Sequence, residues 1–221
     1  NQMTVRRLFS DGRFIEITGE GYEPKGEFRQ DGRTIDPAGN GQIMRLLRAG
    51  ALCNDASLTE HDGRHGIFGD PTEGALVVAA AKAGLHQADL RDRYARIDEL
   101  PFASEKQYMV TLHYMATLHA EEGHSTAFIK GSPEKILSYS RHILKNNDVV
   151  PITESDRTEI AEAASNMGTE ALRVIAIAYR DFPREMERLT DEEVQDNLTF
   201  IGLAGMSDPP RQEAREAIAL C

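Results

Sequence analysis

Positive charge is scarce in this sequence. Its 221 residues carry 25 Lys and Arg against 36 Asp and Glu, a formal net charge of −11. Because a nucleic-acid backbone is bound by a basic face, this balance disfavours nucleic acid as a partner. An anionic small ligand would need cations of its own nearby, since salt screens the remaining charge beyond about 8–10 Å.

Cysteines and long apolar runs are also few. The two cysteines, Cys53 and Cys221, lie far apart in the sequence, which indicates a reducing compartment without a disulfide framework. No apolar run approaches the ~20 residues of a membrane helix, and nothing at the start has the pattern of a signal peptide. We therefore expect that this chain does not itself enter the membrane, and we expect a monomer.

Self-contained catalytic motifs are missing as well. The sequence has no Gly-x-x-x-x-Gly-Lys-Ser/Thr loop, no Gly-x-Ser-x-Gly elbow and no His-Glu-x-x-His helix. Glu60, His61, Asp62 and His65 could suggest a metal, but they lie in a polar, turn-rich stretch that we interpret as solvated surface. We predict no catalytic residue and no metal ligand in this chain.

The turn signals and the periodicity predict an α+β fold, with a mainly antiparallel sheet flanked by helices. Asp-Gly pairs at 11–12, 31–32 and 62–63 are strong hairpin signals. Caps and apolar spacing predict helices over 41–52, 70–83, 86–94, 132–140, 153–167, near 190–193 and from 212 onward, with Gly168 as the stop of the fifth. Apolar runs predict strands over 5–9, 14–18, 97–100, 108–119, 125–129, 174–178 and 198–204.

Three short segments carry an aromatic ring and two cations on rigid elements. Phe102 follows a proline at a strand end, Lys130 closes an apolar strand, and Arg173 opens another. A ring can stack on a base with about 1–3 kcal/mol, and a planar guanidinium suits phosphate oxygens. This combination is what a purine nucleotide requires.

Each candidate also has an ordinary structural interpretation. A lone Phe usually packs in a core, a lysine usually lies on the surface, and Arg173 could be an edge residue of its strand. Gly131 lets a backbone approach a ligand, or simply makes a turn. Glu73 lies in the first turn of a helix, where a carboxylate interacts favourably with the helix dipole.

Several segments, in their order and wording, resemble the nucleotide-binding domain of cation-transporting P-type ATPases. The resemblance covers nearly the whole chain and is closest to the calcium and sodium/potassium branch. Residues 1–5 resemble those that follow the phosphorylated Asp-Lys-Thr-Gly-Thr segment, which is absent here. The other matching segments are 17–22 with 24–26, 51–55, Gly69-Asp-Pro-Thr-Glu-Gly-Ala-Leu76, Lys130-Gly-Ser-Pro-Glu134 and Gly205-Met-Ser-Asp-Pro-Pro-Arg211.

The resemblance implies a role for each candidate. Phe102 would stack on adenine, Glu73 would face the adenine edge, Lys130 with Gly131 would line the pocket, and Arg173 would contact the phosphates of ATP. The sequence departs from the family in one place. Where the family often has a lysine, this chain has Gln107, which could still hydrogen-bond the nucleotide. The preceding Lys106 should point elsewhere, because alternate strand positions face opposite ways.

The resemblance also implies boundaries and partners. We expect a nucleotide-binding domain with an N-terminal hinge strand over 1–206. Residues 207–221 would be a hinge and the truncated start of the phosphorylation domain, with Asp208, Pro209 and Pro210 in the hinge. The two ends should lie close together, as in an inserted domain. The implied partners are ATP and the phosphorylation and actuator domains of the same polypeptide, an integral membrane protein whose cytoplasmic side holds this domain. Mg²⁺ would be supplied mainly by the absent phosphorylation domain.

On this interpretation the full-length protein hydrolyses ATP, whereas the present chain binds ATP without turning it over. Two alternatives remain open. One is an ATP-independent interaction or scaffold module derived from the same fold. The other is a stand-alone hydrolase or kinase-like enzyme, which would need a nucleophile and base of its own.

Overall fold

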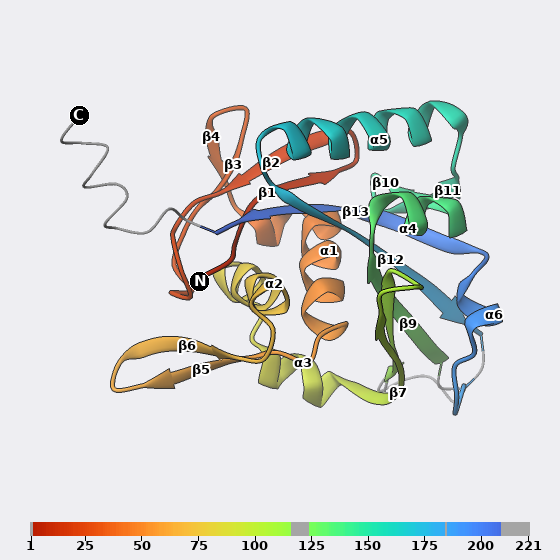
Figure 1. Cartoon of the computed structure of the whole chain (residues 1–221), viewed down its shortest axis with the longest axis horizontal. Coiled ribbons are helices and arrows are strands. Elements are labelled where there is room, and N and C mark those ends of the chain that lie inside the picture. The colour runs from red at the N-terminus through yellow and green to blue at the C-terminus, as the bar shows by residue number, and fades with distance from the viewer. Residues whose placement is uncertain (1, 116–123, 184, 209–221) are drawn as a thin grey trace.

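A mainly antiparallel sheet forms the centre of the molecule (Figure 1). The computed structural model describes residues 2–115, 124–183 and 185–208. Along the sheet the strand order is β4-β3-β2-β1-β13-β12-β9-β8-β7. The bounds are β1 (Thr4–Ser10), β2 (Arg13–Ile17), β3 (Phe28–Gln30), β4 (Arg33–Ile35), β7 (Tyr94–Ala103), β8 (Tyr108–Met115), β9 (His124–Gly131), β12 (Arg173–Phe182) and β13 (Leu198–Ser207). Two further strands lie off this path: β10 (Ser140–Lys145) pairs in parallel with β13 and antiparallel with β11 (Asp148–Pro151).

Helices flank the sheet, and most begin at the predicted caps. They are α1 (Gly41–Leu52), α2 (Pro71–Lys82), α3 (Gln87–Arg93), α4 (Pro133–Tyr139), α5 (Glu154–Thr169) and α6 (Asp191–Val194), with a 3₁₀ turn at Pro37–Gly39. Asp70 accepts hydrogen bonds from the N–H groups of Thr72 and Glu73, and Thr153 forms a capping box with Asp156. The predicted α+β fold is therefore confirmed. In the described part of the chain, no helix has the length and apolarity needed to cross a membrane.

The core has two parts, one on each face of the sheet. Side chains alternate along a strand, so Phe128 of β9 packs with α1 and α2, whereas its neighbour Ile129 packs with α4 and α5. Met109 and Val110 of β8 divide in the same way, as do Ile177 and Ala178 of β12. Figure 1 shows α5 above the sheet and α1 to α3 below it. The face toward α1 and α2 is the one that carries the candidate site.

Two local features differ from what the sequence predicts, and a third agrees with it. Gly168 does not stop α5, because the left-handed turn falls at Ala171, with φ of 58°. The β10–β11 hairpin was not predicted; its turn places Asn146 and Asn147 at positive φ. The hairpin predicted at Asp62-Gly63 is present, and its strands β5 (Ser57–His61) and β6 (Arg64–Phe68) form a two-stranded sheet separate from the main one.

The first and last described strands run side by side. β1 and β13 pair antiparallel, with Thr4 opposite Ser207, and the Gln2 N–H donates to Asp208 Oδ1 at 2.9 Å. The two ends of the described chain therefore lie close together, as predicted. Pro209, Pro210 and the helix predicted from Gln212 lie outside the described residues.

Candidate functional site

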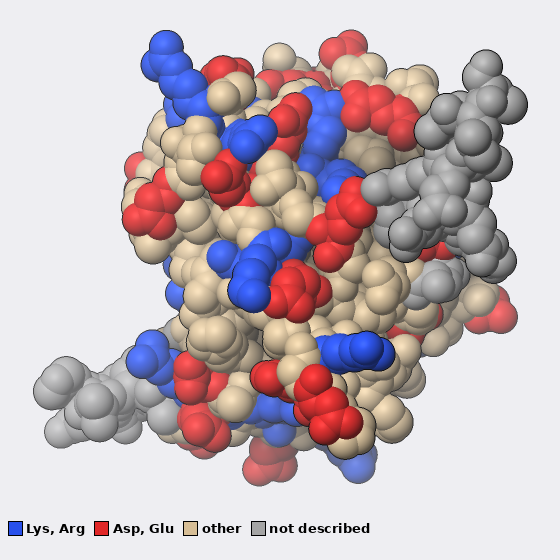
Figure 2. Space-filling model, turned by 90° about the vertical axis from the view of Figure 1, so that its left-hand side faces the viewer, with Lys and Arg blue, Asp and Glu red and all other residues tan. Residues whose placement is uncertain are grey.

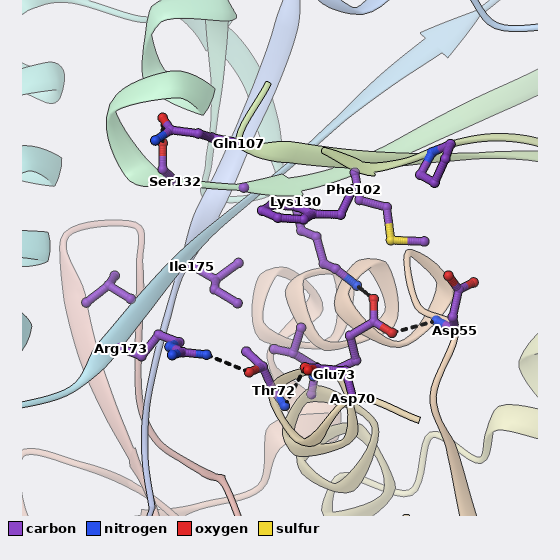
Figure 3. A pocket seen from close by; sticks show the side chains of 15 residues that line it. Asp55, Asp70, Thr72, Glu73, Phe102, Gln107, Lys130, Ser132, Arg173 and Ile175 are labelled. Atoms are coloured by element: carbon purple, nitrogen blue, oxygen red, sulfur yellow. Dashed lines mark hydrogen bonds and ion pairs between the residues drawn. The ribbon is translucent and has the colours of Figure 1, made fainter. Parts of the chain in front are cut away.

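A cleft with a volume of about 690 Å³ opens between the amino end of α2 and the sheet face that carries α1. Figure 3 shows side chains from the sheet on one wall, with Thr72 and Glu73 of α2 opposite them. All the residues predicted to bind nucleotide line this cleft: Glu73, Phe102, Gln107, Lys130, Gly131 and Arg173. The same lining includes Asp55, Asp70, Thr72, Leu76, Pro101, Met109, Ser132, Val174 and Ile175.

Strand register explains the sheet wall of the cleft. Lys130 of β9 lies opposite Met109 of β8 on one side and Ile177 of β12 on the other. Lys130 has the same parity in β9 as Phe128, so its side chain leaves the sheet toward α1 and α2. Along β12, Arg173 has the same parity as Ile177 and lies at the strand's first position. Three strands distant in sequence thus contribute to one surface.

Lys130 is buried and paired rather than exposed. Its Nζ donates to Glu73 Oε1 at 2.5 Å and to the carbonyl oxygen of Cys53 at 2.5 Å. The other oxygen of Glu73 accepts the backbone N–H of Asp55 at 3.2 Å. The Lys130 and Glu73 side chains are only 8% and 16% exposed, so each charge depends on the other for compensation. A ligand entering the cleft meets a preformed ion pair.

Phe102 differs from a core phenylalanine. It is 60% exposed near the end of β7, where it lines the cleft. An exposed ring on the wall of a cleft can accept a flat ligand against its face. The interpretation of Phe102 as an ordinary core residue is therefore wrong.

The turn after β7 separates Gln107 from Lys106. Gln107 has φ of 61° and lines the cleft. Its backbone carbonyl oxygen accepts a hydrogen bond from the Ser132 backbone N–H at 3.0 Å. Lys106 instead forms an ion pair with Asp191 at 2.5 Å. Its charge is directed to α6, and Gln107 is the member of the pair at the cleft. Both residues lie in the turn between β7 and β8, so turn geometry and not strand alternation separates them.

Gly131 is required by the neighbouring strand. A Cβ at this position would lie 2.4 Å from the carbonyl oxygen of Gln107 and 2.8 Å from Tyr108 Cβ. The residue ends β9, so it makes no turn of its own. The tight approach of β8 accounts for the missing side chain.

Arg173 reaches across the cleft to α2. Its Nη1 donates to Thr72 Oγ1 at 2.9 Å, and its side chain remains exposed. Since a hydroxyl is a weak partner for a guanidinium, most of the donors of Arg173 stay available to an anion. Asp55, Asp70 and Glu73 place carboxylates on the α2 side of the same cleft, and Asp55 is paired with Arg96 at 2.8 Å.

Asp55 and the adjacent Asn54 were not predicted as part of the site. They follow Cys53, the C-cap residue of α1, and Asp55 contributes both its carboxylate and its N–H to the cleft region. The available signal was an Asn-Asp pair at the end of an apolar helix, a pattern typical of side chains that bond nearby backbone.

Charge outside the cleft is mixed. Acidic and basic side chains are interspersed over the face shown in Figure 2. His65, from the stretch considered for a metal, has Nδ1 at 3.1 Å from Glu23 Oε2. Within residues 2–115, 124–183 and 185–208, no group of three or more His, Cys, Asp or Glu is arranged to hold a metal ion.

Comparison with known proteins identifies the family of this chain. A family model described as "P-type ATPase, cytoplasmic domain N" matches residues 42–213. Relatives matched over the whole chain include a cation-transporting ATPase pma1 of Synechocystis sp., 38% identical, and a calcium-transporting ATPase of Bacillus subtilis, 33% identical; the chain spans 24% of each. The human calcium-transporting ATPase type 2C member 1 is 33% identical over 99% of this chain, which spans 22% of it. The chain belongs to the family of P-type ATPase cytoplasmic N domains.

Proposed function

We propose that this chain binds ATP in the cleft and presents its γ-phosphate to the phosphorylation domain of a cation-transporting P-type ATPase. One observation carries the proposal: an exposed ring and two cations, from three separate strands, line a single cleft of about 690 Å³. That volume falls within the roughly 300–1,000 Å³ of small-molecule sites. The names of the relatives, cation- and calcium-transporting ATPases, support the wider assignment.

Each lining group has a role that suits its chemistry. Adenine stacks on Phe102, and the Glu73 carboxylate accepts a hydrogen bond from the exocyclic amine. Arg173 binds phosphate oxygens through its planar fork, and Lys130 adds positive charge below the ring. Gln107 supplies a neutral hydrogen bond beside Gly131. Because these groups are held on strands and a capped helix, they orient the nucleotide with little further ordering.

The remaining parts of the reaction lie elsewhere in the longer polypeptide. In-line phosphoryl transfer needs an aspartate nucleophile and Mg²⁺ at the phosphates, which we assign to the phosphorylation domain. The pairing of β1 with β13 supports an inserted domain that moves on a hinge at Asp208, Pro209 and Pro210. We place the boundary at 206–207 and the domain on the cytoplasmic side of the membrane, next to the actuator domain, with no second copy of the chain required.

Substitution of Phe102 tests the proposal. Phe102→Ala removes the stacking surface, and we expect ATP affinity to fall about 5- to 150-fold, the equivalent of 1–3 kcal/mol. Phe68→Ala is the matched control, because Phe68 is 76% exposed and lies outside the cleft lining. Isothermal titration of both variants with ATP measures the difference.

Two results would contradict the proposal. Equal affinities of Phe102→Ala and the unsubstituted protein would mean that the base does not lie on this ring. No ATP-induced shift in the NMR spectrum of the unsubstituted protein would favour the ATP-independent interaction module instead.

A further inference from the structure

We propose that Asn54 is a positioning residue that holds the Glu73–Lys130 pair in place, an inference that rests on the proposed function. Asn54 is 3% exposed and does not line the cleft. Its two neighbours nevertheless contact the pair directly. The Cys53 carbonyl accepts Lys130 Nζ, and the Asp55 N–H donates to Glu73 Oε2. Three consecutive residues therefore hold both charged side chains.

The Asn54 amide connects three segments of backbone. Nδ2 donates to the carbonyl oxygen of Gly50 in α1 at 3.1 Å and to that of Glu73 in α2 at 2.9 Å. Oδ1 accepts the N–H of Ala56 at 2.9 Å. Both donors and one acceptor are satisfied within a buried volume, as buried polar groups require. Of the smaller polar side chains, neither Asp nor Ser supplies two N–H donors.

This geometry lets Asn54 act through Glu73. The amide fixes the backbone of Glu73 against the end of α1, and it fixes the peptide that presents the Asp55 N–H to the Glu73 carboxylate. Without the Asn54 amide, neither the Glu73 backbone nor the Asp55 N–H would be held in position. Because a misplacement of about 1 Å in a binding group can cost 10²-fold, an effect on ligand affinity is expected without any contact between Asn54 and the ligand.

The principal test is a double-substitution cycle on ATP affinity. Asn54→Ser should weaken ATP binding about tenfold in the unsubstituted background. In a Glu73→Gln background the same change should cost less than threefold, because its effect passes through Glu73. A merely structural role would give the same loss in both backgrounds and would overturn the proposal.

Gln42→Ser is the matched control. Gln42, in the first turn of α1, is another buried side-chain amide. It is 4% exposed, its Nε2 donates to the Leu144 carbonyl oxygen at 2.6 Å, and it does not line the cleft. We expect Gln42→Ser to lower stability while ATP affinity stays unchanged. If Gln42→Ser weakens ATP binding as much as Asn54→Ser does, positioning is not specific to Asn54 and the proposal fails.

A nucleotide-free measurement separates this inference from the proposed function. Hydrogen exchange of the Asp55 amide should be at least tenfold faster in Asn54→Ser and unchanged in Gln42→Ser. Unchanged exchange in Asn54→Ser overturns the inference even if ATP binds, whereas failure of the unsubstituted protein to bind ATP rejects the proposed function. If Asn54→Ser does not fold, the side-chain NH₂ resonances of the unsubstituted protein provide the test. On adding ATP, the resonances of Asn54 should shift and those of Gln42 should not. The reverse result rejects the inference.

Discussion

Lys130 has its ammonium group between two protein acceptors, Glu73 Oε1 and the Cys53 carbonyl. Lys130→Ala should therefore lower the stability of the fold as well as weaken nucleotide binding. Removing the ammonium leaves a largely buried carboxylate without its partner, which costs stability as well as affinity. Phe102, which is 60% exposed, is the cleaner position for a binding test.

His113 is expected to make stability depend on pH. The ring is 2% exposed, with Nδ1 at 3.1 Å from the Tyr94 carbonyl oxygen and Nε2 at 3.0 Å from Thr111 Oγ1. A neutral imidazole satisfies both contacts, and burial lowers the pKa of His113 from 6.5 to about 4. As pH falls from 6.5 to about 4, the unfolded chain takes up a proton that the folded chain does not. Stability therefore falls with pH over this window, by about 3 kcal/mol in all.

Urea unfolding at pH 4.5 and pH 7 measures this dependence. His113→Gln should reduce the difference in unfolding free energy between the two pH values. His61→Gln should leave it unchanged, because the side chain of His61 is 94% exposed. An equal pH dependence in the His113→Gln variant and the unsubstituted protein would show that other groups cause it.

At the scale of elements, α2 connects the cleft to the β5–β6 hairpin. Its first turn supplies Thr72 and Glu73 to the cleft, while a Cβ at Gly74 would lie 2.6 Å from Ile67 Cγ2 of β6. At the far end, Lys82 Nζ donates to the Thr18 carbonyl oxygen at 2.8 Å. The helix is therefore held at both ends, which fixes the position of its amino end relative to the sheet side of the cleft.

Two glycines in helices should respond oppositely to alanine. Gly74→Ala forces a methyl group against Ile67, and we expect a loss of about 1–3 kcal/mol. Gly168→Ala in α5 has nothing within 4 Å of the new Cβ, so it should gain about 0.5–1 kcal/mol from helix propensity. Guanidinium unfolding of the two variants provides the comparison. If both alanine variants were stabilised equally, the β5–β6 hairpin would have to shift away from α2 with no loss of stability.

At the scale of the whole molecule, the two ends of the described chain meet beside the cleft-bearing sheet. β1 and β13 are neighbours at the centre of the sheet, so the first and last described strands are themselves part of its core. If the proposed hinge at Asp208, Pro209 and Pro210 bends, the whole cleft should move as one rigid body. Its lining comes from strands of the same sheet and from the helix packed on that sheet.

The chain on its own should bind ATP without hydrolysing it. The Asp-Lys-Thr-Gly segment that would provide the nucleophile is not among its 221 residues. With ATP and Mg²⁺, phosphate release should equal that of the protein-free control. Release above that level, abolished by Phe102→Ala, would show that the domain is itself a hydrolase and would contradict this prediction.

The local structure follows from the sequence by itself, because its signals act over a few residues. Asp70 caps α2 at the predicted position, α1 spans the predicted residues 41–52, and the Asp-Gly pairs at 11–12, 31–32 and 62–63 form the predicted hairpins. Where the turn chemistry was less distinctive, as at Asn146-Asn147, the hairpin was missed.

Only the tertiary structure decided which distant residues meet. The pairing of Lys130 with Glu73, the diversion of Lys106 to Asp191 and the part played by Asn54 all depend on strand register and on how α2 packs against the sheet. Candidate residues could be selected from the sequence, because the resemblance to a known family indicated which distant segments form one site. Their contacts could not, because a hydrogen bond between residues 57 positions apart, such as Lys130 to Glu73, leaves no periodic pattern in the chain.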